Sequence, residues 1–157
     1  MSKLQQLTAF LKANLPDGVC NVEFSSVMDS IQFIPAQRDL GNGQYRMHIK
    51  QYDATIAWGR FPYRQVNPDY IGILIDAWLN ENDDIDDIQL DLERPSMDVD
   101  LNESHQAVVI VTLQLAENVN MREDENGIVP MDGKRWTLCD PDVWIAQEAD
   151  IAGVHSW

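Results

Sequence analysis

The residues that most often do chemistry in small proteins are thinly spread along this sequence. The three histidines, His48, His105 and His155, are scattered, and neither His48 nor His105 has a second histidine or a cysteine at metal-ligand spacing. A structural zinc site needs four converging nitrogen or sulfur ligands, so this spacing argues against one. A Cys-His or Ser-His-Asp set can assemble from distant positions, but no glycine motif of a nucleophile elbow is present. We therefore expect no enzyme activity, no metal and no cofactor.

The two cysteines and the one glycine cluster also have simple structural interpretations. Cys20 and Cys139 lie far apart, and the opening MSKLQQLTAF lacks the continuous apolar segment of an export signal. We therefore expect reduced thiols in a cytosolic protein. Gly41-Asn42-Gly43 lacks the further glycine, the lysine and the strand–loop–helix context of a phosphate-binding loop. Asn42-Gly43 is instead typical of a tight β-hairpin turn.

Acidic residues are the most unusual feature of the composition. The 157 residues include 26 acids against 11 lysines and arginines, which gives a formal net charge of −15. This charge repels polyanions, so a surface that grips phosphates is not expected. Arg94 is the one base among the acids that crowd the middle of the chain. These acids are Glu81, Asp83, Asp84, Asp86, Asp87, Asp91, Glu93, Asp98 and Asp100.

The acidic stretch has two interpretations. Residues 82–87 lack the glycine that a calcium loop needs at its bend, which argues against calcium. The stretch is then either a solvated edge that keeps the protein soluble, or a surface that faces DNA without binding it. Hydrophobic residues make up 45% of the chain, as in ordinary globular domains, and no run approaches the roughly 20 apolar residues that cross a bilayer. We expect no membrane contact.

Two helices and several strands must position these residues. Residues 2–15 predict a helix, because Ser2 and Gln5 form a capping box and a leucine recurs at helical spacing. Short strands are expected at 22–24 and 31–34, followed by the hairpin turn and a long strand. In that strand the apolar alternation slips by one residue between Ile49 and Tyr52. A bulge would keep both apolar sets on one face, and a regular strand would send them to opposite faces.

The second helix and the strands after it have equally clear signals. Asn67-Pro68-Asp69 suits a helix start, and apolar residues continue at helical spacing to Leu79. Strands are predicted at 88–92, 97–101 and 107–115, separated by turns and so arranged as an antiparallel meander. Residues 107–111 are apolar at every position, which predicts a central strand covered on both faces by a second layer or a partner subunit.

The chain beyond Glu117 has a less regular pattern. A short helix is expected from Asp140-Pro141, and this region holds three of the five tryptophans. Large aromatics there either pack on the subunit's own core or anchor a neighbouring subunit. The predicted fold class is α+β, a mostly antiparallel sheet with two main helices packed on it. The predicted division is a core domain at residues 1–118 and a C-terminal extension or arm at 119–157.

By the second helix and the meander, the chain resembles the tail completion protein R family of contractile-tailed temperate phages. The resemblance covers roughly residues 1–118 and depends on the order and spacing of four short pieces. These are Tyr45-Arg46-Met47-His48-Ile49, the helix Ile71 to Leu79 with its Ala77-Trp78-Leu79 end, the acidic loop Asn82 to Asp87, and the strand pair Asp98 to Glu103 and Val109 to Glu117.

The resemblance implies a structural virion protein with a tail-terminator-like fold. Such a protein is assembled in the host cytoplasm and forms a ring, usually of six subunits, at the head-proximal end of the tail tube in the neck. It stops tube polymerisation and offers a surface to the head–tail connector. The implied partners are copies of itself, the tail tube protein and connector proteins, with the tail sheath as a further candidate. Genomic DNA would pass through without specific binding.

Two sets of residues are candidates for these contacts. Asp83, Asp84, Asp86 and Asp87 are placed, as a hypothesis, on the DNA-facing wall of the lumen. Trp136, Trp144, Ile145 and Trp157 are placed at a subunit or tail interface. Two rival functions remain at this point: an acidic DNA mimic that binds a basic DNA-binding partner, and a small hydrolase, which is the weaker of the two.

Overall fold

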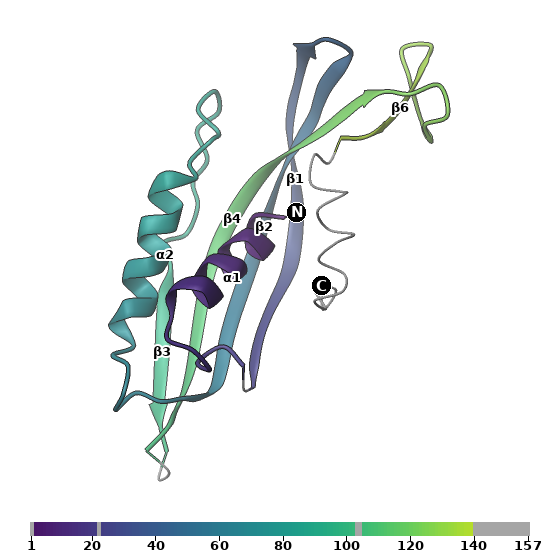
Figure 1. The fold of residues 1–157 in the computed structure, drawn as a ribbon. Helices are drawn as coiled ribbons and strands as arrows, with labels where there is room; N and C mark the ends of the chain where they lie inside the picture. The colour runs from purple at the N-terminus through teal and green to yellow at the C-terminus, as the bar shows by residue number, and fades with distance from the viewer. Residues whose placement is uncertain (1, 22, 103–104, 140–157) are drawn as a thin grey trace. The chain divides into compact units, whose positions relative to one another are not determined.

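The computed structural model describes residues 2–21, 23–102 and 105–139. Two helices and a mostly antiparallel sheet make up this part of the chain, so the predicted α+β class is confirmed (Figure 1). The elements, in chain order, are α1 (Lys3–Asn14), β1 (Phe24–Gly41), β2 (Gln44–Phe61), α2 (Asp69–Glu81), β3 (Ser96–Leu101), β4 (Ala107–Glu123), β5 (Val129–Met131) and β6 (Lys134–Leu138).

The described strands form one sheet in the order β1-β2-β4-β6-β5, with β3 also paired to β4. β3 and β4 are antiparallel, from Ser96 opposite Thr112 to Leu101 opposite Ala107, so this part of the predicted meander is confirmed. The strand predicted at 88–92 is wrong, because those residues are irregular.

The chain divides into two compact units. The helical unit consists of Ser2–Ser30 and Tyr52–Leu115, and the strand unit consists of Ile31–Gln51 and the described residues from Ala116 to Cys139. β1, β2 and β4 each run from one unit into the other. The predicted boundary at residue 118 falls inside β4, and the division into a core domain and an arm stays a prediction.

β1 corrects the expectation of two short strands. Residues 24–41 form one strand of 18 residues, which contains Phe24 from the first expected piece and all of the second, 31–34. Ser30 has a φ of 52°, a left-handed conformation that a regular strand does not use. This local break, where the helical unit ends, explains why the apolar pattern reads as two pieces.

The β1–β2 hairpin confirms the Asn-Gly turn. Asn42 and Gly43 have φ values of 53° and 74°, and two consecutive positive φ values are the mark of a type I′ turn. Asparagine and glycine tolerate this conformation better than other residues, so the sequence fixes where the chain reverses. The Glu123 amide of β4 donates to the Gly43 carbonyl at 2.8 Å, which ties the turn to the neighbouring strand.

The helical unit has one apolar core beneath both helices. The Ser2 hydroxyl accepts from the Gln5 amide at 3.1 Å and the Gln5 side chain accepts from the Ser2 amide at 3.0 Å, so the capping box is confirmed. The Tyr52 hydroxyl accepts from the Leu4 amide at 3.2 Å and joins α1 to β2. The buried residues alternate along β2 and β4 and recur at helical spacing in α1 and α2. They include Leu4, Leu7, Leu11, Leu15, Tyr52, Ala54, Ile56, Trp58, Ile71, Ile75, Trp78, Ala107, Val109, Val111, Leu113 and Leu115.

Both helices cover the same face of the sheet. A second layer or a partner subunit was expected over Val108 and Ile110, which are 36% and 37% exposed in the single chain, so cover by a partner stays a prediction. Strand alternation puts them opposite the buried Val109, and in the described chain no layer lies over that face. The continuous apolar run in β4 therefore supplies both a face that is covered by the helices and an opposite apolar face that is open in the described chain.

The slip in β2 coincides with the passage from one unit to the other. Ile49 and Tyr52 are both fully buried, although they are three residues apart in one strand. Tyr52 belongs to the core of the helical unit, and Ile49 is buried in the strand unit. β4 repeats this behaviour, because the adjacent Leu115 and Ala116 are both buried at the same passage. The change in apolar alternation therefore lets one strand contribute buried residues to the cores of both units.

We expect Leu7→Ala to destabilise the protein by about 2–5 kcal/mol, because it removes a fully buried side chain and leaves a cavity under α1. Urea unfolding followed by circular dichroism measures the loss. Leu101→Ala is the matched control, since Leu101 is exposed in the same unit and its truncation should change stability by roughly 0.5 kcal/mol or less. Equal losses for the two variants would contradict the assigned core.

Candidate functional site

The four candidate carboxylates lie together on the loop that follows α2. Asp83, Asp84, Asp86 and Asp87 are all exposed, whereas Ile85 between them is half-buried. The loop begins where α2 ends at Asn82, whose amide donates to the Leu79 carbonyl at 3.3 Å and whose side chain donates to the Trp78 carbonyl at 2.8 Å. The structure thus brings these four side chains into one acidic loop, residues 82–87.

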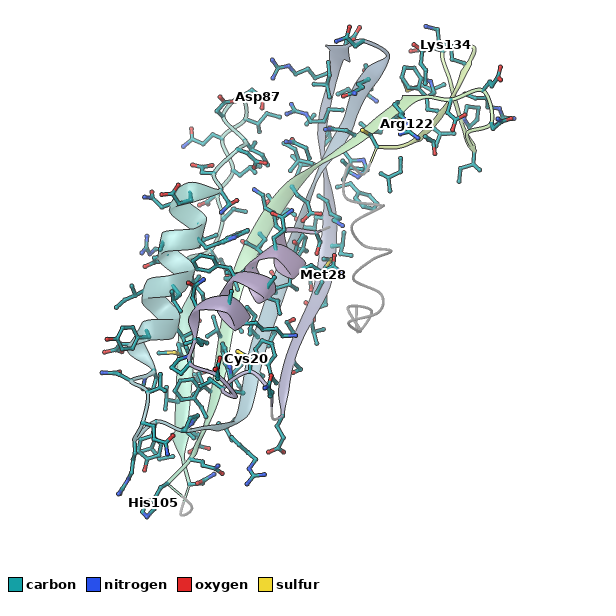
Figure 2. All side chains as sticks on the ribbon, in the orientation of Figure 1. Cys20, Met28, Asp87, His105, Arg122 and Lys134 are labelled. Atoms are coloured by element: carbon teal, nitrogen blue, oxygen red, sulfur yellow. The ribbon has the colours of Figure 1, made fainter. Side chains whose placement is uncertain are left out.

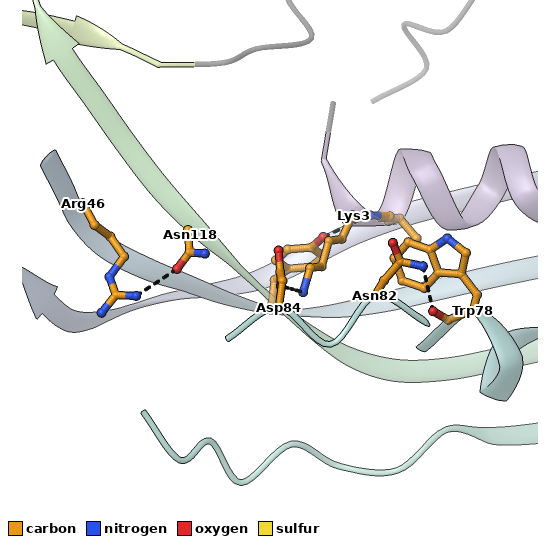
Figure 3. A network of polar contacts seen from close by, with 8 residues as sticks. Lys3, Arg46, Trp78, Asn82, Asp84 and Asn118 are labelled. Carbon is orange, nitrogen blue, oxygen red and sulfur yellow. Dashed lines mark hydrogen bonds and ion pairs between the residues drawn. The ribbon is translucent and has the colours of Figure 1, made fainter. Parts of the chain in front are cut away.

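One ion pair attaches the acidic loop to the first helix. The Lys3 ammonium lies 2.7 Å from Asp84 Oδ1, as Figure 3 shows. Exposed ion pairs of this kind contribute about 0–1 kcal/mol, so the contact fixes the position of the loop more than it stabilises the fold. All four carboxylates of the loop are exposed to solvent.

The remaining acids of the stretch lie on different surfaces. In the register of β3 with β4, Asp98 is opposite Ile110 and Asp100 is opposite Val108, so both lie on the open face of the sheet. Asp53 belongs to the same face, because its Oδ1 accepts from the Gln114 side chain at 3.0 Å. The uncovered face of the helical unit is thus apolar with carboxylates around it.

Neither metal ligands nor a membrane segment can be assembled from the described residues. Within residues 2–21, 23–102 and 105–139, no three side chains of the histidine, cysteine, aspartate or glutamate types converge closely enough to hold a metal ion. In the same part of the chain, no helix has the length and apolar character needed to cross a bilayer.

Burial shifts the pKa of one cysteine and one histidine. Cys20 and Cys139 are both free, and burial raises the pKa of the Cys20 thiol, which outweighs the opposing effects of the Trp58 indole and the Lys12 charge. A protonated buried thiol is a poor nucleophile. Burial, with the Lys50 charge as a smaller cause, lowers the pKa of His48 below 6.5, so its ring is neutral at pH 7.

His48 and Trp136 each pack on an aromatic ring of the strand unit. The His48 ring lies 4.7 Å from the Phe33 ring, between centroids. Trp136 is buried in its own chain, 6.2 Å from the Tyr45 ring, and its Nε1 donates to the Met131 carbonyl at 3.0 Å. The other members of the candidate interface, Trp144, Ile145 and Trp157, lie outside the described residues, and the interface role of all four stays a prediction.

Sequence reasoning missed a buried guanidinium in the strand unit. Arg46 alternates with the apolar Tyr45 and Met47 along β2, yet Arg46 is buried and those two are half-buried. Its Nε donates to the Ala36 carbonyl at 2.8 Å and its Nη1 to Asn118 Oδ1 at 3.2 Å (Figure 3). A charged group can be buried when hydrogen bonds replace its hydration, and alternation alone does not reveal this.

Comparison with known proteins identifies the family of this chain. The sequence profile described as P2 phage tail completion protein R (GpR) matches residues 1–141, which extends past Glu117 through β5 and β6. The chain is also 29% identical over 147 residues to an uncharacterized 19.2 kDa protein from the rep-hol intergenic region of Haemophilus phage HP1 (strain HP1c1), with 94% of this chain and 87% of that one covered. The chain therefore belongs to the P2 phage tail completion protein R family and is a structural component of a phage tail.

Proposed function

We propose that this protein terminates the tail as a ring of identical subunits, usually six in tail terminators, at the head-proximal end of the tail tube. The ring stops tube polymerisation in the neck of the virion and offers a surface to the head–tail connector. The observation that carries this proposal is the family match over residues 1–141. The proposed partners are further copies, the tube protein and the connector, with the sheath of a contractile tail as a further candidate.

Exposed apolar side chains on both units support an assembly role. Contiguous apolar surface is unusual on a solitary soluble chain and marks contact with partners. The helical unit exposes the open sheet face around Val108 and Ile110, and the strand unit exposes Phe33 on β1. A terminating subunit needs several contact surfaces, because it meets neighbours in the ring, the tube below and the connector above.

The acidic loop is proposed to line the passage for DNA. Four exposed carboxylates within six residues repel the phosphate backbone, so DNA makes no lasting contact with such a wall. Residues 140–157 are proposed to reach a neighbouring subunit or the tube. Because Trp136 is covered within its own chain, this docking is assigned mainly to Trp144, Ile145 and Trp157.

The first test is electron microscopy of a lysate from a prophage that lacks this gene. We expect unjoined heads together with tails that are missing, overlong or irregular at the head-proximal end. Complementation with the wild-type gene should restore joined particles. Normal, infectious particles without the gene would contradict a tail-completion role and would leave the acidic DNA mimic, which competition against DNA for a basic partner would then test.

The lumen assignment predicts an effect of charge on DNA ejection. Changing Asp83, Asp84, Asp86 and Asp87 to asparagine should leave particles intact and slow ejection several-fold, because neutral amides can hydrogen-bond to passing phosphates. Ejection triggered in vitro and followed by dye fluorescence measures the rate. The control neutralises four exposed acids outside the loop, Asp17, Asp29, Glu125 and Asp132. Unchanged ejection in the loop variant would remove the acidic loop from the lumen.

The docking assignment predicts that a chain ending at Cys139 folds but does not assemble. This truncation keeps β6 and its pairing with β4, so the urea midpoint should match that of the full chain. Complementation of the gene-deleted prophage should fail to yield joined particles. A control that changes only Trp157 to alanine measures how much of the loss comes from the last residue. A truncated protein that still completes tails would contradict the assignment.

A further inference from the structure

The outward face of α2 has an apolar centre with negative charges beside it. Ile71, Ile75 and Trp78 point into the core, so the opposite side of the helix faces solvent. There Ile73 is 61% exposed and Tyr70 is 57% exposed. We call this surface the α2 face.

Two carboxylates border Ile73 on the same side of the helix. Asp69 lies four residues before it and Asp76 three residues after it, and residues at these separations are neighbours on a helix surface. No lysine or arginine occurs from Asp69 to Glu81, so nothing on α2 offsets these charges. Gly72 has open space where a Cβ would lie, which leaves room for a close approach. The α2 face therefore suits an apolar and basic partner surface.

A surface of that kind occurs on the strand unit, where β4 pairs with β6. Arg122 lies opposite Thr137, and Arg135 is two residues from Thr137 on the same strand, so both arginines lie on one face of the sheet. Arg122 is exposed and makes no ion pair within the described part of the chain. Figure 2 labels it on β4. We call this surface the arginine face.

The other groups near the arginine face strengthen its basic and apolar character. Among the described residues, the Arg135 side chain makes one long hydrogen bond of 3.4 Å, from its Nη1 to the carbonyl of Ile128, and the Ile128 side chain is 87% exposed. Lys134 points to the opposite side of β6 and pairs with Glu123 at 3.0 Å. Two guanidinium groups and an isoleucine are thus presented outward.

Within the described part of the chain, four exposed arginines make no ion pair: Arg64, Arg94, Arg122 and Arg135. Arg122 and Arg135 are the two that lie together on one face of the sheet. Both are available to carboxylates of another molecule, and desolvated arginine–carboxylate pairs are among the stronger polar contacts.

The spacing of the charges also matches. Asp69 and Asp76 are separated by seven residues, about 10 Å along a helix at 1.5 Å per residue. Arg122 and Arg135 are diagonal neighbours on adjacent strands, about 7–8 Å apart at the backbone. Arginine side chains are long and flexible enough to make up the difference between these two separations.

We propose that the arginine face of one subunit binds the α2 face of a second copy of this chain. Arg122 and Arg135 pair with Asp69 and Asp76, and Ile128 packs beside Ile73. The two surfaces differ, so each subunit uses one to bind the subunit before it and the other to bind the subunit after it, as a ring requires. This inference rests on the proposed ring and names the surfaces that join its subunits.

Charge reversal of each surface, alone and in a mixture, tests the pairing. One variant carries Arg122→Glu and Arg135→Glu, and the other carries Asp69→Lys and Asp76→Lys. Each alone places like charges on both surfaces, so we expect self-association to weaken at least tenfold. Mixed in equal amounts, the two variants offer each other complementary surfaces, and we expect assembly to return. Sedimentation velocity at low and moderate salt measures the association.

The controls separate misfolding and non-specific charge effects from the proposed contact. Arg64→Glu and Asp17→Lys reverse exposed charges elsewhere and should leave association unchanged. Circular dichroism and urea midpoints check that every variant folds. If the lysine variant does not fold, Asp69→Asn with Asp76→Asn replaces it and should weaken association to a smaller extent.

Two results would overturn the pairing. In one, the wild-type chain is monomeric throughout, or the single variants associate like wild type. In the other, both variants lose association and their mixture stays dissociated, so the arginines and aspartates face other partners, such as DNA phosphates or another tail protein. The proposed function fails separately, through normal particles in the absence of the gene.

Discussion

Both helices of this protein pack on the same side of the sheet, and most of its other surfaces follow from that arrangement. Leucines of α1 and isoleucines of α2 share one core with the alternate residues of β2 and β4. The cost of leaving Leu, Ile and Trp side chains in water holds that core together. The opposite side of β4 then has no layer of its own within the described residues, so Val108 and Ile110 stay exposed. β4 is apolar on both faces, as a strand between two packed layers would be, but one of its faces is open.

Local signals in the sequence predicted the elements whose causes are themselves local. The capping box at Ser2 and Gln5, the Asn42-Gly43 turn and Pro68 near the start of α2 each act over two to four residues, and each lies where it was expected. The strand expected at 88–92 is wrong, because those residues are irregular although their alternation is compatible with a strand. A strand needs backbone hydrogen bonds to a neighbour, and alternation within one segment does not show whether that neighbour is present.

The candidate surfaces were predictable to different degrees for similar reasons. Asp83, Asp84, Asp86 and Asp87 are close in sequence, so a single loop necessarily groups them. Arg46 was missed because its burial depends on Ala36 and Asn118, which come from other strands. Pairing across strands also sets Arg122 beside Arg135, and no spacing rule within one segment connects the two.

The buried thiol in the helical unit has a consequence of its own. Cys20 lies in the apolar core with α1, and its raised pKa keeps it protonated, so a water-soluble alkylating reagent reaches it only when that core opens. Cys139 is half-buried in the other unit and needs no such opening. Slow modification of Cys20 relative to Cys139 therefore reports how often the core around Cys20 opens. The two thiols thus allow local opening of the core to be measured in the unmodified sequence, with Cys139 as the reference for the rate at Cys20.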